Sequence, residues 1–131
     1  MTDISGGVEI LKSKLFSIAN EINRAPPRTR EIFTEQLLKT TLKNDHPQDV
    51  EDLLYILGHS VTEATDRIEA LNDPAETKAL SQIAQAALRL ENWYVRQDAR
   101  LVLVMDSFTR SRHDKELISS MLPPGNYEIT I

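Results

Sequence analysis

Apolar residues recur at every third or fourth position between Val50 and Leu71, and this spacing constrains the fold more than any other feature. The members of this seam are Val50, Leu54, Leu57, Val61, Ala64, Ile68 and Leu71. Alternating steps of four and three residues return to the same side of an α-helix. The pattern therefore predicts one long helix that packs within a helical bundle.

Prolines and capping residues predict where the other helices begin and end. Pro26 ends a first helix, and the stretches that begin at Asp45 and Asp73 each combine an N-cap with a proline in the first turn. Glu76 is expected to close a capping box on its own helix, and a similar pattern at Ser111 predicts a helix break near 109–112. The predicted helices are 8–23, 29–43, 47–71, 74–109 and 112–121, between an N-terminal tail of 1–7 and an extended tail of 123–131.

These segments predict an all-α fold: a single domain over 1–131, built as an antiparallel bundle of four main helices plus a short C-terminal helix and an extended tail. The chain has 131 residues, of which 40% are hydrophobic, so it is long enough to bury one core. It contains no cysteine. Disulfides, thiol nucleophiles and zinc sites built on thiolates are therefore excluded.

Charge and hydrophobic runs predict where such a chain acts. The first residues, Met1 to Gly7, lack a basic stretch followed by an apolar one, so no secretory leader is predicted. The longest apolar run is Leu101–Met105, whereas a membrane span needs about 20 residues. A net charge of −5 disfavours binding to a phosphate backbone. We expect a soluble cytoplasmic protein that binds neither membranes nor nucleic acid.

A surplus of apolar residues lies between positions 93 and 105. Residues 93–95 are consecutive and apolar, and so are residues 101–105, so both runs cover more of a helix than one stripe. Three interpretations follow: the surplus is core, it is an interface with a second copy or a partner, or 101–105 is a strand that pairs with 127–131. The residues predicted for the interface are Trp93, Leu101, Val102 and Met105.

The preferred function is that of a small, non-enzymatic interaction or regulatory protein. It would bind a protein partner through an apolar helical face and act as a homodimer, as an inhibitor, antiactivator or chaperone-like adaptor does. No catalytic residue, cofactor or metal is predicted, since phosphate-binding glycine loops and nucleophilic serine motifs are absent. The histidines His46, His59 and His113 have no further ligands at metal-binding spacing.

The stretch from Asp49 to Gly58 resembles the second metal-binding helix of the all-α nucleoside triphosphate pyrophosphohydrolases of the MazG type, over about ten residues. The resemblance implies an alternative function, that of a Mg²⁺-dependent nucleotide pyrophosphohydrolase that uses Glu31, Glu35, Asp49 and Asp52. The first carboxylate pair of that family is spaced E-x-x-E, whereas Glu31 and Glu35 lie one residue further apart. The helix dipole by itself favours acidic residues such as Asp49 and Asp52 in a first turn.

A further alternative is a helical nucleic-acid-binding regulator. Basic residues concentrate in two places, which are Arg24, Arg28 and Arg30, and then Arg96, Arg100, Arg110, Arg112 and Lys115. The second group is interleaved with acidic residues, as on a solvated helix face. A nucleic-acid interface would require both groups to form one continuous basic surface.

Overall fold

The computed structural model describes residues 4–43 and 49–109, which form helices and no strand. The helices of this part are α1 (Ile4–Arg24), α2 (Pro27–Lys43), α3 (Val50–Glu69), α4 (Pro74–Val95) and α5 (Ala99–Thr109). The predicted all-α class is confirmed.

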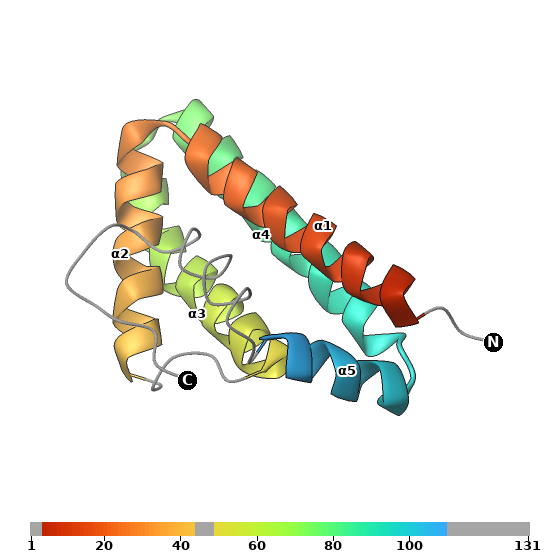
Figure 1. Ribbon diagram of the computed structural model, residues 1–131. Helices are drawn as coiled ribbons and strands as arrows, with labels where there is room; N and C mark the ends of the chain where they lie inside the picture. Colours follow the sequence, from red (N-terminus) through yellow and green to blue (C-terminus); the bar gives the residue numbers. More distant parts are fainter. Residues whose placement is uncertain (1–3, 44–48, 110–131) are drawn as a thin grey trace.

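The helices pack as a bundle in which α3 and α4 form the centre of the contacts. α2 lies along α3, α4 packs on α3, and α1 lies along α4, while α1 and α2 touch only slightly (Figure 1). α5 contacts α1 and, less extensively, α3, and it crosses one end of the bundle (Figure 1). Within residues 4–43 and 49–109, no helix is both long and apolar enough to cross a lipid bilayer.

The core is made of aliphatic side chains from every described helix. α1 contributes Leu11, Leu15, Ile18 and Ile22, all at most 3% exposed, at the four-three-four spacing that brings them to one face. The largest fully buried side chain is Phe33 of α2. This apolar burial provides the main free energy that holds the bundle together.

The turn between α3 and α4 follows the predicted pattern. Asn72 adopts a positive φ of 53°, a left-handed conformation that asparagine tolerates better than most residues. Asp73 then caps α4 by accepting a hydrogen bond from the Ala75 amide at 3.0 Å, and Pro74 occupies the first turn. The predicted start of α4 at Pro74 is therefore confirmed.

The prediction of one continuous helix over 74–109 is wrong, because the chain breaks between Val95 and Ala99. The second of the two resulting helices, α5, ends at Thr109. Asp98 caps α5 by accepting a hydrogen bond from the Leu101 amide at 2.9 Å. The Gln97 side chain donates a hydrogen bond to the Trp93 carbonyl at 2.6 Å and so gives a partner to a backbone carbonyl in the last turn of α4. The predicted helix 112–121 and the tail 123–131 lie outside the described residues.

Three predicted helix starts also differ from the structure. α1 begins at Ile4, so the predicted tail of 1–7 is partly helical, and α2 begins at Pro27 instead of residue 29. α3 begins at Val50, because Asp49 has an extended backbone and its carboxylate accepts a hydrogen bond from the Asp52 amide at 2.8 Å. A cap at Asp49 places the start of this helix three residues later than the predicted residue 47.

Gly7 lets α5 approach α1 closely. The glycine is buried, and a Cβ atom added to it would lie 2.7 Å from Leu101 Cδ1. A side chain at this position would therefore overlap with Leu101.

Candidate protein-binding groove

The apolar surplus at positions 93–105 divides between core and surface. Leu101 and Met105 are 5% and 0% exposed and belong to the core, whereas Trp93 and Val102 are half-buried at its edge. The outward-facing members are Val95 and Leu103, each 68% exposed. The structure therefore does not bring the four predicted interface residues together on one exposed surface. The strand interpretation of 101–105 is wrong, because these residues are helical.

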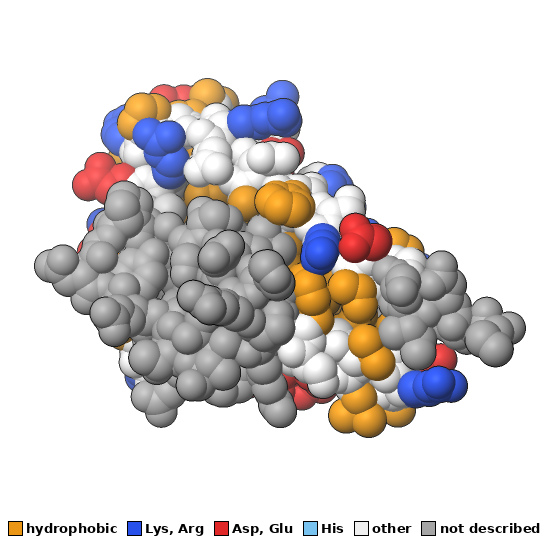
Figure 2. All heavy atoms as spheres, in the orientation of Figure 1, with side chains coloured by type: hydrophobic (Ala, Val, Ile, Leu, Met, Phe, Trp, Pro, Cys, Tyr) orange, Lys and Arg blue, Asp and Glu red, His pale blue; other side chains and the backbone are white. Residues whose placement is uncertain are grey.

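Apolar side chains also gather over α5 on the face drawn in Figure 2. The exposed or half-buried apolar residues of this helix are Val102, Leu103, Val104 and Phe108. The Lys12 ammonium of α1 lies 5.3 Å from the centre of the Phe108 ring, so part of this surface is already covered by a cation–π contact.

The four carboxylates of the magnesium alternative do not converge. Glu35 forms ion pairs with Lys39 at 3.1 Å and with Arg67 at 3.2 Å, and hydrogen bonds from Lys39 and then Arg67 lower its pKa. Arg67 lies fifteen residues after Asp52 on α3, which corresponds to about 22 Å along the helix. Glu35 and Asp52 are therefore held far apart. Among the described residues, no group of three or more His, Asp and Glu side chains is placed to hold a metal ion.

The arginines of the nucleic-acid alternative lie at opposite ends of α4. Arg28 is bound to Asp73 at 3.1 Å and to Glu76 at 3.3 Å, beside the start of this helix. Arg96 follows its last residue, twenty residues and thus about 30 Å beyond Glu76. The described arginines therefore do not form one continuous basic surface. Arg110, Arg112 and Lys115 lie outside the described residues.

One buried polar atom near the end of α4 has no hydrogen-bond partner in the described part of the chain, namely the Tyr94 hydroxyl. Burial raises the pKa of Tyr94 to about 12, with smaller contributions from the charges of Asp106, Glu51 and Asp49. The hydroxyl therefore stays protonated near neutral pH.

A groove with an apolar floor runs between α3 and α4 on the outside of the bundle. Its cavity is about 220 Å³, and it is lined by Leu54, Gly58, Val61, Ala84, Ala87, Leu88 and Glu91. Gly58 lies in the middle of α3, and a Cβ atom added to it would meet nothing within 4 Å. The floor is therefore made of small residues, with larger aliphatic side chains beside it.

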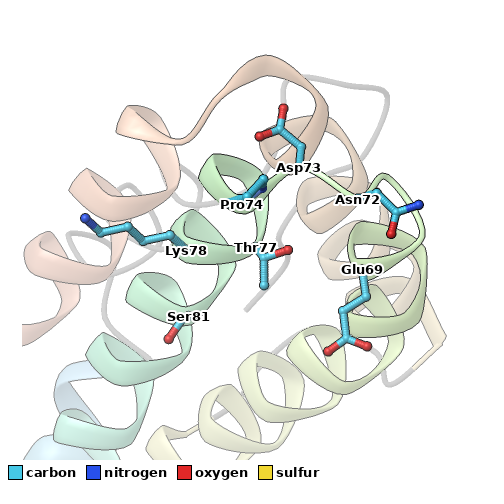
Figure 3. A pocket seen from close by; sticks show the side chains of 7 residues that line it. All are labelled: Glu69, Asn72, Asp73, Pro74, Thr77, Lys78 and Ser81. Carbon is cyan, nitrogen blue, oxygen red and sulfur yellow. The ribbon is translucent and has the colours of Figure 1, made fainter.

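A polar pocket of about 580 Å³ continues this groove toward the turn between the two helices. Glu69 of α3 faces Thr77 and Ser81 of α4 there, while Lys78 extends to the other side (Figure 3). On α4, the residues that line both pockets recur at four-three-four-three spacing, which places them on one side of the helix: Thr77, Ser81, Ala84, Leu88 and Glu91. The two pockets therefore lie on one side of α4 and together span about 21 Å, from position 77 to position 91. The pair of pockets is called the groove between α3 and α4.

Exposed apolar side chains lie along the same two helices. Leu88, which lines the groove, is 51% exposed, and Val95 lies two turns further along the same side of α4. On α3, Tyr55 is 57% exposed, and its ring stacks on that of His59 at a centroid distance of 5.7 Å. The groove is therefore flanked by apolar side chains that are more than half exposed.

Sequence reasoning assigned the groove residues of α3 to the core seam. Leu54 and Val61 are only half-buried, whereas Leu53, Ile56 and Ser60, outside the seam, are buried. α3 is packed between α2 and α4, so its buried face is wider than one stripe and is turned toward α2. The feature that could have revealed the groove is Gly58, a glycine in the middle of a strongly helical segment.

Comparison of the chain with protein-family models, with curated proteins and with solved structures finds no match.

Proposed function

We propose that this protein is a non-enzymatic interaction module that binds a helix of a protein partner in the groove between α3 and α4. The observation that carries the proposal is Gly58 at the floor of that groove. A glycine inside a helix lowers stability by about 0.5–1 kcal/mol relative to alanine. A position that keeps it needs a compensating reason.

The fold of the chain supplies no such reason at Gly58. In the described part of the chain no glycine has a positive φ, so the backbone at Gly58 is accessible to any residue. A Cβ atom at Gly58 would also have free space around it, in contrast to Gly7. The side chains at a contact set the distance between two packed helices. Because Gly58 has no side chain, the backbone of another helix can approach α3 closely there.

The residues around Gly58 suit a helical ligand. Leu54, Val61 and Leu88 offer aliphatic contacts on both sides of the floor, and an apolar groove of this kind is one of the recurring ways in which proteins bind amphipathic helices. A groove of about 21 Å accommodates about 14 residues of helix, or four turns. Such a ligand would place apolar residues at positions i, i+4, i+7 and i+11 over the groove.

A peptide experiment tests the proposal directly. The probe is a fluorescein-labelled 15-residue helical peptide with leucine on one face and only glutamine and alanine elsewhere, and its binding is followed by fluorescence anisotropy. We expect wild-type protein to bind it and Gly58→Leu to bind at least about tenfold more weakly, a difference of about 1.4 kcal/mol. A Cβ atom at position 58 meets nothing within 4 Å, so we expect the leucine side chain to extend into the groove and block it.

The matched control is Ser107→Leu, which adds the same side chain to an exposed position of α5. This variant should bind the peptide like wild type, and circular dichroism should show that both variants are folded. Equal binding by folded Gly58→Leu protein would overturn the proposed groove. Absence of binding to any amphipathic helix would overturn the proposed function.

The homodimer predicted from the sequence stays a prediction. Its predicted contacts included Leu101 and Met105, which are buried within one copy of the chain. Sedimentation or light scattering over a concentration series measures self-association independently of the peptide assay. The pyrophosphohydrolase alternative receives no support from the positions of Glu35 and Asp52, which the ion pair to Arg67 holds far apart.

A further inference from the structure

Building on the proposed function, we infer that the partner helix is basic: an amphipathic segment of about 14 residues whose apolar face is flanked by lysine or arginine. The inference rests on the charges along the groove. Carboxylates lie at both ends of its apolar floor, with Glu69 in the polar pocket and Glu91 beside Leu54 and Leu88. An occupant that crosses the floor therefore meets negative charge at both ends.

A third carboxylate extends the same edge. Glu51 is exposed and lies three residues before Leu54, on the side of α3 that continues to Gly58 and Val61. None of Glu51, Glu69 and Glu91 forms an ion pair with a described residue, whereas Glu35 and Glu76 are paired with arginine. Within residues 4–43 and 49–109, no cationic side chain therefore neutralises the three carboxylates along the groove.

Positive charge is nearly absent from the lining. Lys78 belongs to the polar pocket, but its side chain extends away from Glu69 and toward the other side of α4 (Figure 3). The remaining acidic residue of that pocket, Asp73, is bound to Arg28 at 3.1 Å and points toward α2. The groove therefore presents a predominantly negative rim around an apolar floor, and the complementary ligand is a helix with a positive rim.

The same charges disfavour a second copy of this chain as the occupant. The chain carries a net charge of −5, and symmetric pairing of two such grooves would place carboxylates opposite carboxylates. Like charges across an interface are unfavourable. A basic helix in the groove would instead place lysine or arginine opposite these carboxylates.

The test uses three 15-residue peptides with one shared leucine face and with lysine, glutamine or glutamate at the flanking positions. At low ionic strength we expect the lysine peptide to bind the full-length protein about tenfold more tightly than the glutamate peptide, with the glutamine peptide between them. The difference should shrink as salt is added, because salt screens exposed charges.

Two variants locate the effect. The double variant Glu69→Gln/Glu91→Gln should lose most of the preference for the lysine peptide over the glutamate peptide. The control is Glu63→Gln, because Glu63 lies on α3 outside the groove lining and contacts His59 at 3.7 Å. This control should keep the full preference.

The outcomes separate the two proposals. If wild-type protein binds all three peptides equally and Gly58→Leu weakens all of them, the inference of a basic partner is overturned. The proposed groove function then remains supported. Binding of the lysine peptide that Gly58→Leu does not weaken overturns the inference, because it shows attraction to the surface without docking in the groove. Self-association that Gly58→Leu abolishes identifies a second copy as the occupant and also overturns it. Failure of all three peptides to bind overturns the proposed function itself.

Discussion

The Glu76 carboxylate of α4 accepts a hydrogen bond from the Thr29 backbone amide of α2 at 2.8 Å. The Thr29 hydroxyl binds the same carboxylate oxygen, and Arg28 Nε donates to the other oxygen at 3.3 Å. Glu76 is only 4% exposed, so its charge is buried with its hydrogen-bonding capacity met. The Glu76 side chain therefore provides the acceptor for a backbone amide in the first turn of α2, and it connects the start of α4 to the start of α2.

Glu76→Ala should be strongly destabilising, because it leaves the buried Thr29 amide and the Arg28 guanidinium without their acceptor. Hydrogen bonds to charged groups contribute about 1.5–3 kcal/mol, so we expect the free energy of unfolding to fall by about 2–3 kcal/mol. Urea denaturation followed by circular dichroism measures it. Glu69→Ala, at an exposed position of the preceding helix α3, serves as the control and should change stability by less than about 0.5 kcal/mol.

The Glu76 contact should also make stability depend on pH. The hydrogen bond from the Thr29 hydroxyl lowers the pKa of Glu76 from its ordinary value of 4.5, against the opposing effect of burial. A carboxyl whose pKa is lower in the folded state stabilises the fold above its unfolded pKa, and this contribution disappears as pH falls through the folded pKa. The stability difference between wild type and Glu76→Gln should therefore be largest near neutral pH and shrink below pH 4.5. A difference that stays constant down to about pH 3 would contradict this assignment.

Replacing Gly58 and Gly7 by alanine should change the free energy of unfolding in opposite directions. Gly58→Ala should raise the free energy of unfolding by about 0.5–1 kcal/mol, because a Cβ there meets no atom and alanine favours the helix. Gly7→Ala should lower it by about 1 kcal/mol, because its Cβ would lie 2.7 Å from Leu101 Cδ1 in a packed region. Thermal and urea denaturation of the two variants, side by side, decide the question. A loss of stability in Gly58→Ala would show that the glycine serves the fold after all.

Met105 and Leu103 provide a matched comparison on α5. Met105 has no exposed surface, so Met105→Ala should lower the free energy of unfolding by about 2–5 kcal/mol through the cavity it creates. Leu103 is 68% exposed, and Leu103→Ala should change it by less than about 0.5 kcal/mol. Equal effects of the two substitutions would contradict the orientation of α5.

Asp98 should stabilise the separate helix α5. Asp98→Ala removes the acceptor of the Leu101 amide and should cost about 1 kcal/mol of stability, the usual loss for an N-cap. Asp98→Asn should retain most of the stability, because asparagine is an equally good N-cap. If Asp98→Ala leaves both the stability and the helix content unchanged, the cap is not what ends α4 and starts α5.

The limits of prediction are clearest at the junction of α4 and α5. The apolar seam of α4 continues past Gln97, so the spacing of residues alone favours a single long helix. The break is encoded by Asp98, but aspartate occurs as often within solvated helix faces. Spacing within the helix also does not reveal the tertiary contact of Leu101, which packs against Gly7 of α1 in the folded chain.

By itself, the sequence determined that the chain is all-α and that α4 begins at Pro74. Such features depend on hydrogen bonds and spacings within a few residues, as between Asp73 and Ala75, so the neighbouring residues encode them. Only the tertiary structure decided that Glu76 binds Thr29, that Met105 is core and that Gly58 forms the floor of a groove. Burial and partner choice depend on which helices lie beside a residue, and those neighbours come from positions far away in the chain.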